Sequence, residues 1–254
     1  MPKFAVYYVP EENTKFYSLG TQILGYDVRN RLSIEMHRDL QDRIGTFEKD
    51  WVKNARPFGF HLTIIDAIDF DYDDIQRIER EIDNILNCFN PAHPFVLQRR
   101  DKDFVTFGDP PAYWGRQLCV LRYDANDYLK ILQTLLVARV NPLGIGSGYL
   151  QSYLKNPEMY EREPYKAHRT RKFYSPTILD DYSPHFTLLN PYTGKDHQRL
   201  RDLFTEMFGH FPVILVNSIC LLVQMHEDDN WVIHGEFKRE SYPAPLHADF
   251  KEQR

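Results

Sequence analysis

Two short segments carry the residues best suited to chemistry. Residues 59–65 read GFHLTII and residues 183–189 read SPHFTLL, so each contains a histidine, an apolar residue, a threonine and two more apolar residues. An imidazole titrates near neutral pH and a hydroxyl can donate a hydrogen bond, so the repeated pattern predicts acid–base chemistry on an anionic group. The four polar residues of the two segments are His61, Thr63, His185 and Thr187.

Each segment has the length and composition of a buried β-strand. Side chains two residues apart on a strand point to the same face, about 7 Å from each other. His61 and Thr63 therefore share one face, as do His185 and Thr187. The apolar residues point the other way and are expected to pack against the helix that follows each segment. Two such strands side by side would present two imidazoles and two hydroxyls to one ligand.

That set of groups suits a phosphodiester. Its cleavage needs a base for the attacking oxygen and an acid for the leaving oxygen, and two imidazoles can fill both roles without a metal. The threonine hydroxyls can donate to the non-bridging phosphate oxygens, where charge builds up in the transition state. The segments therefore predict a phosphodiester ligand, no cofactor and no metal.

Other interpretations of the two segments were weighed against this one. A single His-x-Thr on an apolar strand is usually structural, but two copies that each open a similar unit make that explanation weaker. Two core strands of a scaffold protein remain an alternative. Zinc is the weaker hypothesis, because each segment offers one nitrogen ligand with no cysteine or carboxylate at ligand spacing nearby.

The composition limits the class of protein. The chain has 254 residues, 43% of them hydrophobic and 14% aromatic, which is typical of a folded globular protein. Its net charge of −5 argues against a general nucleic-acid binder. The three cysteines lack metal-ligand spacing. No apolar run approaches the ~18 residues of a membrane helix, and the first residues lack a signal-peptide pattern. We expect a soluble, cytoplasmic protein with no membrane partner.

Periodicity and turn signals place the elements around these segments. Besides the segments themselves, strands are expected at 4–9, 95–98, 104–107, 117–123, 213–225 and 231–237. Helices are expected at 16–24, 38–47, 71–89, 127–140 and 198–208.

The order of a His-x-Thr strand, then a helix, then further strands occurs twice. This weak duplication predicts an α+β fold of two pseudo-symmetric lobes, each an antiparallel sheet packed with helices, flanking a central cleft within a single domain, 1–254. The first lobe is expected at roughly 45–125, and the second at roughly 180–240 plus the N-terminal strand. Residues 141–176 are expected to form an inserted connection or lid. Its basic run 166–172 is either a solvated charged face or the lining of an anion site.

The two His-x-Thr segments resemble the motifs of the 2H phosphoesterase superfamily. Residues 4–10 (FAVYYVP), 19–27 and 56–61 (RPFGFH) further resemble the branch of that superfamily associated with bacterial phosphonate-metabolism operons. The superfamily layout covers most of the chain, and the match to the branch covers about the first 65 residues. The second segment departs from the branch, because YSPHFT at 182–187 stands where the branch has Phe-Arg-Phe-His-x-Thr.

The resemblance implies roles and a reaction. His61 and His185 become the catalytic acid–base pair, and Thr63 and Thr187 bind the phosphate. It implies a metal-independent phosphoric diester hydrolase that acts on a cyclic or 2′,5′-linked nucleotide or ribose phosphodiester, with RNA ends as a further ligand. The alternative is a nucleotide or RNA-end binding module without turnover.

Several other side chains are candidate substrate contacts. Arg56 precedes the first segment closely enough to reach a phosphate, although a surface role fits it equally well. An aromatic ring beside the cleft could stack on a base. The aromatic candidates are Tyr7, Tyr113, Phe173, Tyr182 and Tyr192.

Overall fold

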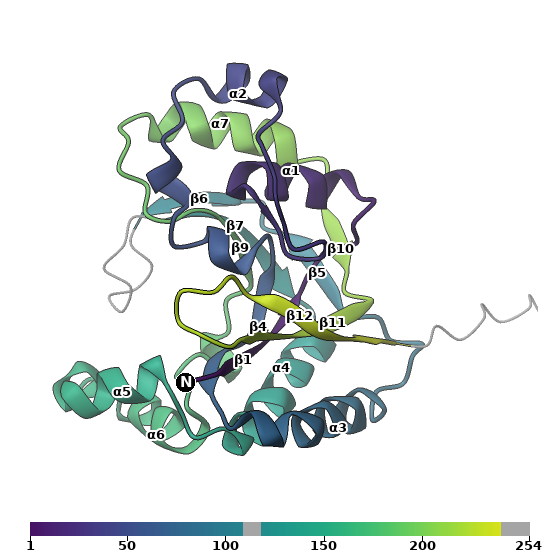
Figure 1. The fold of residues 1–254 in the computed structure, drawn as a ribbon, viewed down its shortest axis with the longest axis vertical. Coiled ribbons are helices and arrows are strands. Elements are labelled where there is room, and N and C mark those ends of the chain that lie inside the picture. The colour runs from purple at the N-terminus through teal and green to yellow at the C-terminus, as the bar shows by residue number, and fades with distance from the viewer. Residues whose placement is uncertain (109–117, 240–254) are drawn as a thin grey trace, which may run out of the picture.

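The strands that carry the two His-x-Thr segments are neighbours in the middle of one antiparallel sheet (Figure 1). They are β4 (Leu62–Asp69), which begins just after His61, and β9 (His185–Leu189). The computed structural model describes residues 1–108 and 118–239. Within these residues the chain has an α+β fold, in which the main sheet curls into an antiparallel half-barrel.

The main sheet has 10 strands within the described residues. Its central path runs β10-β5-β7-β9-β4-β1-β11-β12, while β6 pairs with β7 and β8 pairs with β4. The remaining strands of this sheet are β1 (Lys3–Tyr8), β5 (Val96–Arg99), β6 (Val105–Gly108), β7 (Leu118–Ala125), β8 (Gly146–Ser147), β10 (Val213–Leu215), β11 (Ser218–Gln224) and β12 (Val232–Lys238). A separate pair consists of β2 (Tyr26–Asp27) and β3 (Leu32–Ser33).

Helices lie at two ends of the sheet (Figure 1). In that view α1, α2 and α7 gather at the top, and α3, α4, α5 and α6 at the bottom. The α-helices are α1 (Lys15–Leu24), α2 (Arg38–Ile44), α3 (Ile75–Leu86), α4 (Asp127–Arg139), α5 (Gly148–Lys155), α6 (Pro164–Phe173) and α7 (His197–Phe208). None of the helices in the described part of the chain is long and apolar enough to cross a membrane.

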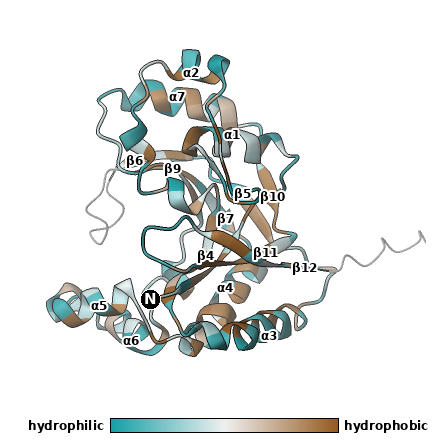
Figure 2. Ribbon diagram, in the orientation of Figure 1, coloured by the Kyte–Doolittle hydropathy of each residue, from teal (hydrophilic) through white to brown (hydrophobic). Residues whose placement is uncertain are grey.

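The hydropathy of the residues differs between the strands of the sheet and the helices around it (Figure 2). Strands such as β10 and β11 are largely hydrophobic, whereas α3 and α7 alternate between hydrophobic and hydrophilic residues along their length. In α3 the buried residues are Ile75, Ile78, Ile82, Ile85 and Leu86, which is the spacing of one helix face. Burial of that single face is what holds the helix against the rest of the molecule, because its remaining residues are mostly charged or polar.

The apolar sides of the two motif strands meet in one aromatic cluster. The rings of Phe60 and Phe186 stack with centroids 5.0 Å apart, and Phe16 of α1 lies 5.1 Å from Phe60 and 5.0 Å from Phe186. Phe208 of α7 completes the cluster. A Cβ on Gly20 would lie 2.1 Å from the Phe60 ring, so α1 can approach this closely only because residue 20 is a glycine. The helix beneath the first segment is therefore α1, not the helix that follows it.

Most of the predicted elements are confirmed. Strand 4–9 and helices 16–24, 38–47, 127–140 and 198–208 match β1, α1, α2, α4 and α7 within a few residues. The predicted helix 71–89 begins with a 3-10 turn and is α-helical only over α3. Position 117, at the start of the predicted strand 117–123, lies outside the described residues.

Two predictions about organisation differ from the structure. The predicted strand 213–225 is two strands, because β10 pairs with β5 and β11 pairs with β1. Residues 141–176, expected to be an inserted connection or lid, contain α5, α6 and β8.

The expected lobe boundaries also do not follow the sheet. Strands β5, β6 and β7, all within 95–125, lie on the side of β9, whereas β1, β11 and β12 lie on the side of β4. Chain order gave the expected lobes, but the hydrogen-bonded order crosses between the two halves of the sequence. Such crossing leaves no mark in a single sequence, because local periodicity reports which face of a strand is buried and not which strand lies beside it.

Candidate active site

The register between the motif strands places their polar residues side by side. Leu62 is paired with Phe186, and both side chains are fully buried on the apolar face. Continued by one residue in each direction, this antiparallel register sets Thr63 opposite His185 and His61 opposite Thr187. Opposed residues in such a pair have Cα atoms about 4.5–5.5 Å apart. Each histidine thus faces the threonine of the other segment, on the face opposite to the buried apolar pair.

The two imidazoles are held in the same way. Nδ1 of His61 donates to the carbonyl of Gly59 at 2.9 Å, and Nδ1 of His185 donates to the carbonyl of Ser183 at 2.8 Å. A carbonyl can only accept, so in both neutral rings the proton sits on Nδ1 and the lone pair on Nε2. Both Nε2 atoms are then available to take a proton from a reacting group.

Local backbone geometry supplies the carbonyl at the first segment. Gly59 has φ +69°, and a Cβ there would lie 2.6 Å from Cβ of Val28. A side chain is therefore excluded on both conformational and steric grounds. Glycine at this position allows the turn that aims its carbonyl at the ring of His61.

The imidazole of His61 has two further contacts. Oγ1 of Thr63 lies 3.3 Å from Nε2 of His61, and the hydroxyl is the donor when the ring is neutral. The ring of Tyr7 stacks on the imidazole with centroids 3.9 Å apart and an interplanar angle of 15°. An aromatic face favours the cationic form of a ring above it, so Tyr7 both fixes the ring and favours the imidazolium.

Both histidines are neutral at pH 7 in the ligand-free protein. Burial lowers the pKa of His61 to about 4, the Gly59 carbonyl opposes this, and the charge of His185 lowers the pKa further. Burial also lowers the pKa of His185, and the nearby Arg122 guanidinium adds to that effect while the Ser183 carbonyl opposes it. The effect of His185 on the pKa of His61 indicates that the two rings are close enough to interact electrostatically.

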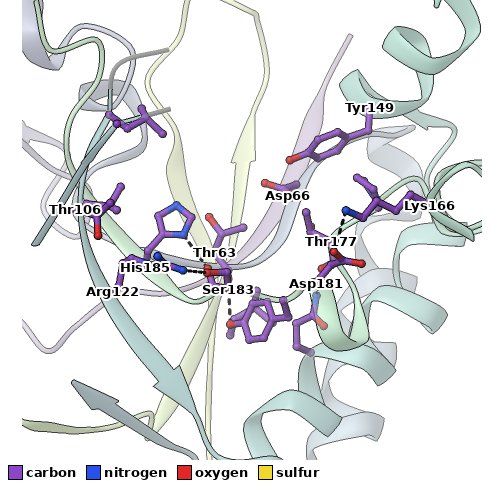
Figure 3. A pocket seen from close by; sticks show the side chains of 17 residues that line it. Thr63, Asp66, Thr106, Arg122, Tyr149, Lys166, Thr177, Asp181, Ser183 and His185 are labelled. Carbon is purple, nitrogen blue, oxygen red and sulfur yellow. Dashed lines mark hydrogen bonds and ion pairs between the residues drawn. The ribbon is translucent and has the colours of Figure 1, made fainter. Parts of the chain in front are cut away.

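A pocket of about 260 Å³ opens beside the motif strands (Figure 3). Of the four motif residues, Thr63 and His185 line it, whereas His61 and Thr187 are half-buried beside them on the same strand face. The other polar or charged lining residues are Asp66, Thr106, Arg122, Gln133, Tyr149, Lys166, Thr177, Asp181, Tyr182 and Ser183. In Figure 3, Thr63 lies between His185 on one side and Asp66 on the other.

Arg122 on β7 gives the histidine end of the pocket a positive charge. It is the register partner of His185 and donates to Oγ of Ser183 at 3.4 Å. No carboxylate lies within ion-pair distance of its guanidinium among the described residues. Burial and the neighbouring Arg100 lower its pKa, and the side chain still remains a cation at neutral pH. It is thus placed to contact an anion beside His185.

Asp66 marks the other end of the pocket. Strict strand alternation would place residue 66 on the face opposite to Thr63, but the pairing of β4 with β1 shifts register twice, between Phe4 and Val6 and again between Val6 and Tyr7. Each shift adds a residue to β4 without a partner, which reverses the alternation beyond it. The shift between Thr63 and Ile65, the partners of Tyr7 and Val6, comes before Asp66, so the Asp66 carboxylate lies on the pocket face.

The carboxylate of Asp66 is held by two hydroxyl groups. The side chains of Thr177 and Tyr149 hydrogen-bond to it, and these bonds lower its pKa. Burial raises the pKa by more than they lower it, so the pKa of Asp66 rises to about 6. In Figure 3 the Tyr149 hydroxyl points toward Asp66 from the helices on the right.

An ion-pair network joins α6 to the segment before β9. Nζ of Lys166 lies 3.0 Å from Asp181 and 2.6 Å from Glu163, and Arg169 contacts Asp181 at 2.6 Å and Asp180 at 2.8 Å. Lys166 is 7% exposed and lines the pocket. Two members of the predicted basic run thus have carboxylate partners, and the network fixes the chain just before Ser183 and His185.

The structure places the secondary candidates from the sequence differently. Tyr182 lines the pocket, and its hydroxyl donates to the carbonyl of Thr63 at 3.3 Å. The ring of Tyr7 is covered by His61, which leaves that face closed to a base. Tyr113 lies outside the described residues.

The other three candidates do not reach the pocket. The guanidinium of Arg56 donates to the carbonyl of Gly25 and to Oγ of Ser33, so it points to the N-terminal turn. Phe173 packs against the core at the end of α6 and is not among the lining residues. Tyr192 is buried against Trp51, with ring centroids 4.8 Å apart.

Several pocket residues were not predicted as functional. Arg122 could have been suspected, because it is an arginine at a partly buried position of an apolar strand. The sequence carried no comparable signal for Asp66, since the register shifts in β4 depend on its partner. Tyr149 and Thr177 lie in or just after the segment expected to be a connection.

Comparisons with known proteins add no relative to this description. A scan against protein-family models gave no match, and neither did a search of curated proteins. Within the described residues, no group of three or more histidine, cysteine, aspartate or glutamate side chains is arranged to hold a metal ion.

Proposed function

We propose that this chain is a phosphodiesterase of the 2H type, which hydrolyses a cyclic or 2′,5′-linked nucleotide or ribose phosphodiester without a metal, using His61 and His185 as acid and base. One observation carries the proposal. The register around Leu62 and Phe186 brings both His-x-Thr segments together at the centre of the sheet, with both imidazoles in the same tautomer. A structural role would not require two matched rings whose Nε2 atoms are both unprotonated.

The sheet order supports a two-lobe description centred on this junction. The path β12-β11-β1-β4 forms one half and β9-β7-β5-β10 the other, with each motif strand innermost in its half. In this proposal the halves are the pseudo-symmetric lobes of a 2H-type fold, and the phosphate lies over the border between β4 and β9. Arg122 and Tyr7 then lie on the two strands that flank this border.

The proposed reaction moves two protons. One neutral Nε2 takes a proton from water as its oxygen attacks phosphorus, and the protonated Nε2 of the other ring gives its proton to the departing ribose oxygen as the P–O bond breaks. Thr63, Thr187 and the cation of Arg122 stabilise the charge on the non-bridging oxygens. The product is a phosphomonoester, and the symmetric site allows either histidine to start as the acid.

The contact between Thr63 and His61 links protonation to phosphate binding. In the neutral ring, Nε2 accepts from the Thr63 hydroxyl. Once His61 is protonated, its Nε2 donates to Oγ1 of Thr63. The Thr63 hydroxyl can then donate its own hydrogen bond to a phosphate oxygen. A bound phosphate therefore favours the imidazolium that the reaction needs.

The test is hydrolysis of a panel of 2′,3′-cyclic, 3′,5′-cyclic, 2′,5′-linked and ribose 1,2-cyclic phosphates. We expect His61→Ala and His185→Ala each to lower turnover at least ~100-fold on the substrate that is cleaved. His234→Ala is the matched control, because His234 on β12 pairs with Glu79 and is absent from the pocket lining. Full activity in both motif variants on every substrate would refute the proposal, as would loss of activity with EDTA.

One observation favours a second candidate, a nucleotide or RNA-end binding module without turnover. Burial lowers the pKa of both histidines, which disfavours the imidazolium that would act as the acid at neutral pH. In an enzyme, a phosphate bound in the pocket would raise these pKa values and so supply the imidazolium acid. A binding module without turnover does not need an imidazolium. Product release from a stoichiometric amount of cyclic nucleotide distinguishes the two, since a binding module returns the cyclic nucleotide intact.

A further inference from the structure

The pocket has two chemically different ends. Near His185 it offers donors and positive charge, from Arg122, Ser183 and Thr63. At the other end, around Asp66, the lining offers acceptors. Figure 3 shows Asp66, Tyr149 and Thr177 grouped on the side away from Arg122. A phosphate would be repelled by the Asp66 carboxylate, so this end must receive a different part of the ligand.

Asp66 has acceptor capacity beyond its internal partners. An ionised carboxylate has about four lone-pair positions, and hydroxyls of Thr177 and Tyr149 occupy two. Both of these donors are neutral, and no cation stabilises the carboxylate among the described residues. Two acceptor positions therefore remain on this half-buried carboxylate, which lines the pocket.

Gln133 on α4 provides a second, independent acceptor. Its side chain is 2% exposed and lines the same pocket, and its Nε2 donates to the carbonyl of Thr177 at 2.9 Å. Its Oε1 is buried and has no hydrogen-bond partner among the described residues. A buried amide oxygen without a donor is costly, which indicates that a donor arrives with the ligand or with a water.

The spacing fits the organic part of a phosphate ester. Asp66 follows Thr63 by three residues on β4, so the carboxylate lies roughly 7–10 Å from the phosphate position at extended-strand spacing. That is the scale of the separation between the phosphate of a nucleotide and the far side of its nucleoside. The pocket volume of about 260 Å³ leaves room for such a group between the two ends.

We propose that the Asp66 end of the pocket binds an adjacent pair of hydrogen-bond donors on the organic part of the ligand, as presented by N1–H and the N2 amino group of guanine or by a vicinal diol. The placement of the phosphate at the other end rests on the proposed function. Asp66 accepts the donor pair, Gln133 accepts a further donor, and Tyr149 and Thr177 hold the carboxylate in place. The subsite would thus determine which phosphodiester is accepted.

The experiment measures dissociation constants by calorimetry for matched probes. Guanosine 2′-monophosphate is compared with inosine 2′-monophosphate, which lacks the amino group, and ribose 5-phosphate with 2-deoxyribose 5-phosphate, which lacks the vicinal diol. Inorganic phosphate reports on the other end alone. We expect the wild type to bind the donor-rich member of one pair roughly 10-fold more tightly, since a charged acceptor would lose a partner.

The variant Asp66→Asn should abolish this preference and leave the affinity for inorganic phosphate within about twofold. Asp228→Asn, an exposed carboxylate in the turn before β12, is the matched control and should behave like the wild type. Equal affinity of the wild type for the two members of both pairs would overturn the subsite. So would an Asp66→Asn variant that loses as much affinity for inorganic phosphate as for the organic probes.

The two proposals fail in different ways. If wild-type protein does not bind inorganic phosphate or any phosphorylated probe, the proposed function fails. Guanosine and inosine without phosphate then still test the subsite, because the two nucleosides differ only in that amino group. A preference for guanosine that Asp66→Asn removes would support the subsite alone, and equal binding of the two nucleosides would reject it.

Discussion

His61 and His185 reach the same state from different local sequences. Gly59 supplies the carbonyl for His61, and Ser183 supplies it for His185. The glycine is needed because its φ is +69°, whereas position 183 is not among the residues with positive φ. Matched hydrogen bonding on two unlike backbones argues that the tautomer itself, with both Nε2 atoms open, is what the two segments share.

The ionised carboxylate of Asp66, which we propose binds the ligand, should destabilise the folded protein at neutral pH. Its pKa is raised from 3.8 to about 6, so the folded protein binds this proton more tightly than the unfolded chain. The resulting stabilisation is present below about pH 4 and is lost as the pH rises through about 6. Above that pH, the buried charge destabilises the fold by about 2–3 kcal/mol.

We therefore expect Asp66→Asn to be more stable than the wild type at pH 7.5, by about 2 kcal/mol, and to lose that advantage near pH 4. Urea unfolding at both pH values measures the difference, with Asp228→Asn as the exposed control. An identical difference between Asp66→Asn and the wild type at the two pH values would show that the pKa of Asp66 is not raised in the folded protein.

At the scale of residues, the sequence was informative where chemistry is local. A histidine and a threonine two positions apart share a strand face whatever the partner strand does, so the motif residues could be identified from the chain alone. Asp66 could not, because its face depends on register shifts between β4 and β1. For Arg56 the sequence left a phosphate contact and a surface role open, since its nearness in sequence to His61 gave no information about the direction of its side chain.

At the scale of elements, the turn before β4 is the most constrained part of the site. The short 3-10 helix Arg56–Phe58 ends at Gly59, whose amide donates to the carbonyl of Arg56. The carbonyl of Gly59 itself accepts the hydrogen bond from the ring of His61. A side chain at position 59 would have to adopt a positive φ and displace Val28.

Gly59→Ala is expected to lower the free energy of unfolding by roughly 2 kcal/mol and to reduce phosphodiester hydrolysis, because the carbonyl that fixes Nδ1 must move. Gly148→Ala is the matched control, since a Cβ there meets no atom within 4 Å. Urea unfolding and hydrolysis rates measure the two effects. A Gly59→Ala protein as stable and as active as the wild type would contradict this account of the turn.

The insertion shows why element-level prediction stopped short. Residues 141–176 contain several glycines, prolines and charges, which favour loops when each position is considered locally. In the structure, capping offsets that tendency, because Oγ of Ser147 accepts from the amide of Leu150 at the start of α5. Ion pairs from Lys166 and Arg169 to Asp181 hold α6 against the chain before β9. The ion pairs are tertiary contacts, so composition could not reveal that residues of this segment line the pocket.

At the scale of the whole molecule, an anionic ligand approaches a chain of net charge −5. Long-range attraction therefore does not favour binding, and the pocket must supply the positive charge locally. Arg122 provides one charge, and a proton on His61 or His185 would provide the second. Both rings are neutral in the ligand-free protein because burial lowers the pKa of each. The negative phosphodiester reverses that preference, since an opposite charge within a few ångströms raises the pKa of an imidazole.

Ligand binding should consequently take up a proton. At pH 7 we expect the uptake of up to about one proton per bound phosphodiester, because the ligand itself does not titrate there and burial favours the neutral form of both imidazoles in the free protein. Calorimetry in buffers of different ionisation enthalpy gives the number directly. His61→Gln or His185→Gln should lower it, whereas His234→Gln on β12 should leave it unchanged. Binding of a phosphodiester without proton uptake would mean that no imidazolium forms in the complex, and the acid step at the centre of the sheet would lose its proton donor.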